Sequence, residues 1–291
     1  SWSPDSKNVV YQQISDHGIV VTSAESYQPR VITSTNRDIA YISPNWSPVS
    51  NQIVIEANNL NISYIVIINP DGGGLRFITN TPDNTESMPR WSPDASQIAF
   101  FESDTYPTEA SQTKIDLINA DGTNRHVLKV YDSSNFIPNS LEWSPNGKHL
   151  LIGAFLNTKF VILVIDIASD ETKTLADDLS SVITPTWSAD STYIAYSTFY
   201  TSQTTYLVNI NDASKTKFAI DNVESLSFIP NRTSVITQAS APVTTSVTEI
   251  AATATLEIPS NSFATPSILT GQENLPVPSP TPVEIQSTDA E

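Results

Sequence analysis

The sequence predicts an all-β protein that folds as a β-propeller of four-stranded blades. One observation behind this prediction is a Trp-Ser-Pro-Asp-like segment that recurs along the chain. It begins at five tryptophans, Trp2, Trp46, Trp91, Trp143 and Trp187. The other is their spacing of 44, 45, 52 and 44 residues, after which Phe228 follows at 41 residues with Phe in place of Trp. A fixed period of about 40–45 residues is typical of propeller blades.

Each unit contains the same four predicted strands in the same order. The innermost strand leads into the tryptophan, and the Ser-Pro-Asp-like turn follows it. Alternating apolar runs predict a second strand at 97–101, 149–155 and 193–199. Further apolar runs that end in turn residues predict a third at 64–74, 114–123, 160–169 and 206–214. Short segments predict a fourth at 75–79, 125–129, 172–176 and 216–220. Such runs, separated by Asn, Asp, Gly and Pro, are typical of antiparallel strands joined by tight turns.

The number of repeats predicts about six blades. Five units are complete after their tryptophan, and a partial sixth begins near Glu224. Only Ser1 precedes Trp2, so we interpret the chain as a fragment that begins inside its first blade, without that blade's innermost strand. The sixth repeat is clear to about Gln238, and the segment 243–258 is the candidate for its outer strands. We therefore predict a propeller domain at 1–238 that extends at most to about residue 258.

The remaining segment, 239–291, has a different composition. It contains seven prolines, six acidic residues and no lysine or arginine, and Ser and Thr dominate the rest. A segment with so little periodic apolar content cannot bury enough surface to offset the loss of chain entropy. We predict a disordered Ser/Thr/Pro-rich acidic tail or linker, in which Pro-rich stretches act as semi-rigid spacers.

The recurring aromatic residues predict the way in which the blades pack. Each of the five tryptophans, and Phe228 in the sixth unit, is expected to fill the wedge between neighbouring blades. Ser-Pro-Asp is expected to turn the chain from the innermost strand into the next. These residues are therefore assigned a structural role.

One set of residues is the candidate binding site. Side chains alternate between the two faces of a strand, so the residues one before each aromatic should lie opposite it, towards the propeller axis. They are Asn45, Arg90, Glu142, Thr186 and Ser227. The residues three before each aromatic are expected on the same face, and they are Ser43, Met88, Ser140, Thr184 and Ser225. Two interpretations remain open: a funnel that binds a ligand or peptide end, and a hydrated channel in which an Arg90–Glu142 pair only stabilises packing.

The sequence contains no recognisable catalytic or metal site. There is no Cys, which excludes disulfides, thiolate metal ligands and Cys nucleophiles. His17, His126 and His149 occupy three different positions in the repeat, so they are not expected to converge on a metal. None of the eight glycines is placed in a nucleophile elbow or a phosphate-binding loop. We expect no catalytic residue and no cofactor. The longer loop 103–112 is equally compatible with a specificity loop and with an unconstrained surface loop.

Charge and hydropathy limit the partners. The net charge of −17 disfavours nucleic acid and anionic membrane surfaces. The longest apolar runs, 65–68 and 161–165, are far shorter than the roughly 20 residues needed to span a bilayer. We expect a monomer that does not insert into membranes, with a protein or peptide as its partner.

The repeat resembles that of TolB-like, WD-repeat-like propellers over roughly residues 1–238. The matching features are the WSPD-type turn, the IAF-type strand after it and the later INADGT-type hairpin at 118–123. This resemblance implies a periplasmic or extracellular protein, exported by a signal outside this segment, that binds partner proteins through one face and the funnel. A cytoplasmic location stays open, because a chain without Cys suits both compartments.

Three functions follow from these observations. The leading hypothesis is a non-enzymatic binding module. The second is an accessory, substrate-gating or sensor propeller of a larger enzyme, such as a prolyl-oligopeptidase-type hydrolase or a kinase. The third, a propeller enzyme that acts on polysaccharide through a metal site, is disfavoured by the scattered histidines.

Overall fold

The computed structural model describes residues 1–13, 18–33, 39–59, 62–105, 111–179, 182–198, 204–212, 215–218, 223–228, 233–239, 254–258 and 267–268. The regular elements in these ranges are all β-strands, β1 to β23. Nowhere in the same ranges does a helix have the length and apolar character needed to cross a membrane.

The strands form one three-stranded and five four-stranded sheets in chain order. The first sheet contains β1 (Asn8–Gln13), β2 (Gly18–Ser23) and β3 (Pro29–Val31). The second contains β4 (Ala40–Trp46), β5 (Ile53–Asn59), β6 (Ile62–Ile68) and β7 (Arg76–Phe77). The third contains β8 (Asn84–Trp91), β9 (Gln97–Asp104), β10 (Gln112–Asn119) and β11 (His126–Asp132). The fourth contains β12 (Phe136–Trp143), β13 (His149–Leu156), β14 (Lys159–Asp166) and β15 (Thr172–Leu179).

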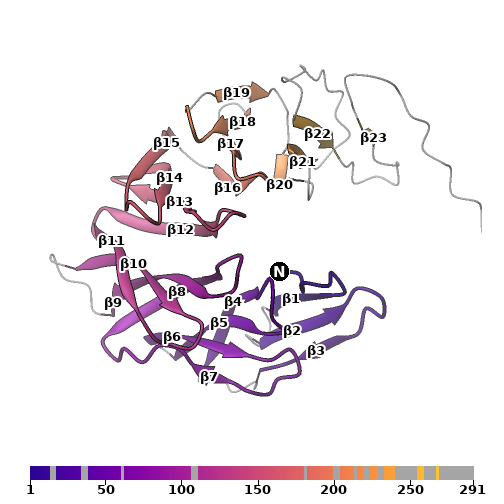
Figure 1. Cartoon of the computed structure of the whole chain (residues 1–291), viewed down its shortest axis with the longest axis vertical. Helices are drawn as coiled ribbons and strands as arrows, with labels where there is room; N and C mark the ends of the chain where they lie inside the picture. Colours follow the sequence, from indigo (N-terminus) through magenta and orange to yellow (C-terminus); the bar gives the residue numbers. More distant parts are fainter. Residues whose placement is uncertain are drawn as a thin grey trace, which may run out of the picture.

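The fifth sheet contains β16 (Val182–Trp187), β17 (Tyr193–Thr198), β18 (Thr204–Asn209) and β19 (Lys215–Phe218). The sixth contains β20 (Val223–Phe228), β21 (Thr233–Ala239), β22 (Ala254–Ile258) and β23 (Ser267–Ile268). Figure 1 shows the sheets following one another around a common centre, with the strand that leads into each aromatic residue nearest to it. The predicted β-propeller of four-stranded blades is confirmed. The ring is open between the first sheet, where the N-terminus lies, and the sixth.

All six units share one strand register. Each aromatic residue faces the residue seven positions later on the second strand, as in the pairs Trp91↔Ile98 and Trp143↔Leu150. The same offset holds for Trp46, Trp187 and Phe228. Trp2 retains it as an isolated bridge to Val9. The first sheet therefore lacks the rest of its innermost strand, as the sequence predicted, while the register at its tryptophan is preserved.

The Ser-Pro-Asp-like turn is a hydrogen-bonded unit. In the third sheet, the Ser92 hydroxyl donates to Asp94 Oδ1 (2.6 Å) and accepts from the backbone N–H of Gln97 (3.0 Å). The fourth residue after the tryptophan has a positive φ in four of the units, which lets the chain reverse tightly. These residues are Ser6, Ala95, Gly147 and Ser191. The predicted turning role of the motif is confirmed, and its serine and acidic residue together hold the reversal.

Four tryptophans fill the spaces between successive sheets, as predicted. Trp46, Trp91, Trp143 and Trp187 are 3–7% exposed, and each lies in an apolar cluster that joins two neighbouring sheets. Trp91 of the third sheet, for example, packs with Ile65 of the second sheet and with Phe100.

The same prediction is wrong for Trp2, which is 58% exposed. A wedge residue becomes buried only when a preceding sheet covers it, and in the open ring none of the described strands covers Trp2. Phe228 ends β20 at the expected position, but its side chain lies outside the described side chains.

Basic side chains join the sheets at the outer rim. In four successive pairs of sheets, a Lys or Arg on the outermost strand donates a hydrogen bond to a carbonyl in or beside the hairpin turn after the third strand of the next sheet. The pairs are Arg30 with Pro70 (2.6 Å), Arg76 with Ala120 (2.8 Å), Lys129 with Asp170 (2.7 Å) and Lys173 with Ile210 (2.7 Å). Because these donors are charged, the bonds are stronger than neutral ones. We call these four contacts the rim bonds.

The sixth sheet differs from the predicted antiparallel pattern. β22 falls within the segment 243–258 that was the candidate for outer strands, but it pairs parallel to β21. A parallel pair requires a crossover, and its connecting residues 240–253 lie outside the described residues. β23 adds a short antiparallel pair. The remainder of the predicted tail, 259–266 and 269–291, lies outside the described residues, so the boundary near residue 238 stays a prediction.

Trp91→Ala is expected to lower the free energy of unfolding by roughly 3–5 kcal/mol, because it leaves a cavity between the second and third sheets. The matched variant Trp2→Ala should change it by less than about 1 kcal/mol, because Trp2 is already exposed. Urea denaturation of the two variants measures both values. Equal losses would contradict the assignment of Trp91 as a wedge.

Candidate binding site: the axial ring and the turn face

The predicted site residues occupy equivalent positions at the ends of the innermost strands. Asn45, Arg90, Glu142 and Thr186, from β4, β8, β12 and β16, are half-buried. Ser227 has the same place in β20, but its side chain lies outside the described side chains. We call these five residues the axial ring.

Members of the axial ring bind the backbone of the next sheet. Asn45 Oδ1 accepts a hydrogen bond from the backbone N–H of Trp91 (2.9 Å). Ser1, one residue before Trp2, does the same through its Oγ for the N–H of Trp46 (3.1 Å). Glu142 accepts from the backbone N–H of Trp187 and from the hydroxyl of Thr186. The innermost strand has a free edge towards the axis, and these side chains satisfy the N–H groups that point to it.

Arg90 breaks this pattern, because a guanidinium has no acceptor atom. Its Nη1 donates to the carbonyl of Pro89 (2.8 Å). Its own backbone carbonyl accepts from the indole Nε1 of Trp143 (3.1 Å). The other three buried tryptophans, Trp46, Trp91 and Trp187, have indole N–H groups without a partner. The third and fourth sheets are therefore joined by a hydrogen bond from the indole N–H of Trp143.

The ionisable groups in and beside the axial ring have shifted pKa values. Burial raises the pKa of Glu142 to about 7, against the attraction of Arg90 and two hydrogen bonds that favour the ionised form. Burial also lowers the pKa of Arg90, which the charge of Glu142 partly offsets. Burial, and then repulsion from Arg90, lower the pKa of the Ser1 amino group. Arg90 and Glu142 thus affect each other's pKa through charge, in a partly desolvated environment.

The residues three before each aromatic do not simply share the axial face. A β-bulge interrupts each of four innermost strands. In β4, β8 and β16 it includes the residue three before the aromatic, and in β12 it lies just before Ser140. Side chains therefore do not alternate strictly there. Ser43 and Met88 have a positive φ of 54°. Met88 packs on the apolar cluster around Trp143, and Ser140 Oγ accepts from the N–H of Gly153 (3.2 Å). Met88 and Ser140 thus have packing roles that the alternation rule did not predict.

An ionic cluster in the third sheet was missed by the sequence reasoning. Arg125 pairs with Glu86 (2.9 Å), Asp116 (2.6 Å) and Glu102, and Lys114 pairs with Glu102 (2.7 Å). The three carboxylates are at most 5% exposed, and burial raises the pKa of Glu86 and Asp116. The available signal was the presence of acidic residues inside apolar runs, FFES for Glu102 and KIDLI for Asp116.

The described histidines do not converge. His126 contacts the carbonyl of Asn124 (3.1 Å). His149 Nε2 lies 3.4 Å from Asp166 Oδ2, and its ring stacks on Trp187. His17 lies outside the described residues. In the part of the chain that the structure describes, no group of three or more His, Asp or Glu side chains is placed to hold a metal ion.

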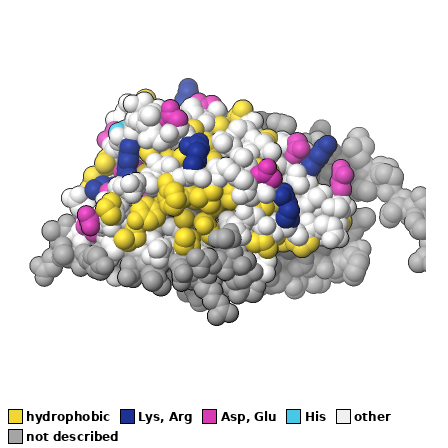
Figure 2. Space-filling view, turned by 90° about the horizontal axis from the view of Figure 1, so that it is seen from below, with side chains coloured by type: hydrophobic (Ala, Val, Ile, Leu, Met, Phe, Trp, Pro, Cys, Tyr) yellow, Lys and Arg dark blue, Asp and Glu magenta, His cyan; other side chains and the backbone are white. Residues whose placement is uncertain are grey.

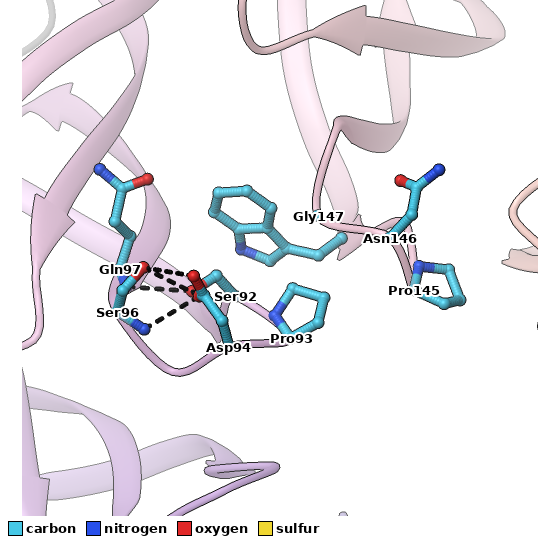
Figure 3. A pocket seen from close by; sticks show the side chains of 9 residues that line it. Ser92, Pro93, Asp94, Ser96, Gln97, Pro145, Asn146 and Gly147 are labelled. Atoms are coloured by element: carbon cyan, nitrogen blue, oxygen red, sulfur yellow. Dashed lines mark hydrogen bonds between the residues drawn. The ribbon is translucent and has the colours of Figure 1, made fainter.

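A groove opens between two Ser-Pro-Asp-like turns. It has a volume of about 340 Å3 and lies between the turn after Trp91 and the turn after Trp143 (Figure 3). Such turns follow the innermost strand in the second to fifth sheets, and the turn after Trp2 has the equivalent place in the first, so they lie on one side of the propeller, which we call the turn face. Its turns are residues 3–6, 47–50, 92–96, 144–147 and 188–191. The sequence predicted the turns, but it gave no indication that two of them flank a groove.

Comparisons with known proteins agree with this architecture. No protein-family model matches the chain. The Tol-Pal system protein TolB of Francisella tularensis is 28% identical over 132 residues, which is 44% of this chain and 29% of that protein. The solved structure of TolB from Acinetobacter baumannii has a TM-score of 0.55 at 16% identity, and the match covers 76% of this chain and 53% of that one. The chain is a β-propeller that is similar in part to TolB.

The chain is also similar to two enzymes. Dipeptidyl-peptidase 5 of Trichophyton schoenleinii is 27% identical over 143 residues, 46% of this chain and 20% of that protein. An oligogalacturonate lyase in complex with manganese has a TM-score of 0.60 at 15% identity, over 77% of this chain and 64% of that one. The described residues offer no ligand set for such a metal. The chain spans less than a third of the curated relatives it matches.

Glu142→Gln is expected to change the pH dependence of stability. The folded-state pKa of about 7 lies above the ordinary value of 4.5, so folding retains a proton that the unfolded chain releases. Glu142 therefore makes the folded state less stable as the pH rises from about 4.5 to about 7, and the penalty is constant above that.

The measurement is urea denaturation of both proteins at a series of pH values. Across this pH window, the free energy of unfolding of the Glu142→Gln variant should rise relative to that of the wild type by up to about 3 kcal/mol. A difference that does not vary with pH would contradict the shifted pKa.

Proposed function

We propose that this TolB-like propeller is a non-enzymatic docking module. It binds a protein or peptide partner through the turn face and the axial ring, in the cell envelope or outside the cell. The observation that carries the proposal is the groove between two turns of the turn face. The partial sequence similarity to TolB supports it.

The packing between sheets suits docking. Wedge tryptophans, axial side chains and rim bonds each connect one sheet to the next, so the turns are held in fixed relative positions. A preorganised surface loses little conformational entropy when it binds a partner, which increases affinity. The net charge of −17 favours a partner with basic patches and accelerates its association.

The described polar side chains suit this role better than catalysis. Glu86, Glu102 and Asp116 are committed to Arg125 and Lys114. Asn45 and Glu142 bind backbone N–H groups of the next sheet. Buried charges paired in this way are typical of structural networks.

A second candidate function is supported by the similarity to dipeptidyl-peptidase 5. In that case the propeller is an accessory part of a larger enzyme, and its face gates substrate or senses a ligand for a catalytic domain. The same turn face would then contact a catalytic domain.

The absence of cysteine permits a direct test. Asn146→Cys places a photo-crosslinker beside the groove, and Val127→Cys places it on the outer strand β11, where Val127 is 47% exposed. Each labelled chain is incubated with extract of the source cells, irradiated and analysed by mass spectrometry.

The proposal expects one or a few proteins to be cross-linked from position 146 and not from position 127. Identical product patterns from the two positions, or none from position 146, would overturn it. A hydrolase or kinase domain cross-linked from position 146 would replace the docking function with the accessory one.

A further inference from the structure

The groove on the turn face has two different walls. One wall comes from the turn after Trp91, and the other comes from Trp143 and the turn after it (Figure 3). The lining residues are Ser92, Pro93, Asp94, Ser96 and Gln97 in the first wall and Trp143, Pro145, Asn146 and Gly147 in the second. Pro93 and Pro145 contribute no backbone N–H, so these two wall positions offer no backbone donor to a bound group. These two positions therefore add no donor for an anion, and the carboxylate of Asp94 in the lining favours a ligand that donates hydrogen bonds.

Asp94 supplies a fixed negative charge at this groove. Its Oδ1 accepts bonds from the Ser92 hydroxyl (2.6 Å) and from the N–H and hydroxyl of Ser96 (3.0 and 2.8 Å). Its Oδ2 also accepts from the Ser96 hydroxyl (2.9 Å). The bonds from Ser92 and Ser96 lower the pKa of Asp94, so it is ionised at neutral pH. A carboxylate has about four acceptor sites, and Oδ2 retains capacity for a further donor.

Trp143 supplies an aromatic wall in a fixed orientation. Its indole N–H is held by the carbonyl of Arg90 (3.1 Å), and the residue is 7% exposed, so only a small part of it reaches the groove. A cation close to an indole is attracted by the ring, most strongly when it is partly desolvated. An aromatic side chain beside a carboxylate is an arrangement that recognises cationic side chains.

We propose that this groove receives a lysine or arginine side chain of the protein partner, with Asp94 as the counter-charge and Trp143 as the aromatic wall. The inference rests on the proposed docking function and specifies the chemistry of the partner. The groove volume of about 340 Å3 accommodates one long side chain. The acidic character of the whole chain attracts the same basic partner from a distance.

The test is a titration of the full chain with a hexalysine peptide, in which binding is measured by isothermal titration calorimetry and by tryptophan fluorescence. A hexaglutamate peptide is the probe of opposite charge. Titrations are run at about 0.15 M salt, where long-range attraction between exposed charges is screened. The wild type should bind hexalysine and not hexaglutamate.

Two matched variants separate the groove from general acidity. Asp94→Asn keeps an acceptor for the turn and removes one charge at the groove. Asp5→Asn makes the same change in the turn after Trp2, where Asp5 has the equivalent bond from the Ser3 hydroxyl (2.6 Å). We expect Asp94→Asn to weaken hexalysine binding about fivefold or more, while Asp5→Asn changes it less than about twofold. Unchanged melting temperatures confirm that both variants remain folded.

Equal losses in the two variants would overturn the proposal, because they would show attraction to the acidic surface alone. Absence of hexalysine binding to the wild type would also overturn it. In either case, the docking function would still be supported if a partner is cross-linked from position 146. Only the proposal that the groove receives a cationic side chain would then be withdrawn.

Discussion

The contact on which the rest of the structure depends is the junction between successive sheets at each buried tryptophan. The indole fills the wedge between two sheets. At three junctions the backbone N–H of the same residue is bound by a side chain of the preceding sheet, Ser1, Asn45 or Glu142. Apolar burial and a hydrogen bond across the junction thus meet at one residue, whose backbone N–H would otherwise be unpaired at the free edge of the innermost strand. This explains why tryptophan recurs at a fixed period.

The rim bonds complete the connection at the opposite end of each sheet. A cation on the outermost strand reaches the hairpin region of the next sheet in four successive pairs. The first five sheets are therefore joined in the wedge and at the rim, and three of their four junctions are also joined by an axial side chain. Such a scaffold fixes the turns of the turn face, including the two that flank the groove of Figure 3. Figure 2 shows an area of apolar side chains with scattered charged side chains around it on the side of the molecule that it displays.

The repeat period was sufficient to predict the propeller, the position of each innermost strand and the wedge role of four tryptophans. It failed at Trp2, because burial of a wedge depends on a neighbouring sheet and not on the residue itself. The rule that side chains alternate between strand faces failed at Ser43 and Met88. Both have a positive φ within a bulge, and neither residue type indicates such a backbone conformation. Asn45 accepts a hydrogen bond from the backbone N–H of Trp91, which is 46 positions later in the sequence. This contact could not be predicted, because it depends on how the second and third sheets are arranged in space.

Native-state amide hydrogen exchange at Trp91 tests the central claim most directly. Its N–H lies on the free inner edge of β8 and is bound by Asn45 of the preceding sheet. If the junction holds the sheets together as one cooperative unit, this amide should exchange only on global unfolding, with the same opening free energy as the core amide of Phe100. Exchange at Trp91 that is many times faster than at Phe100 would show that the junction opens locally, and it would contradict the account.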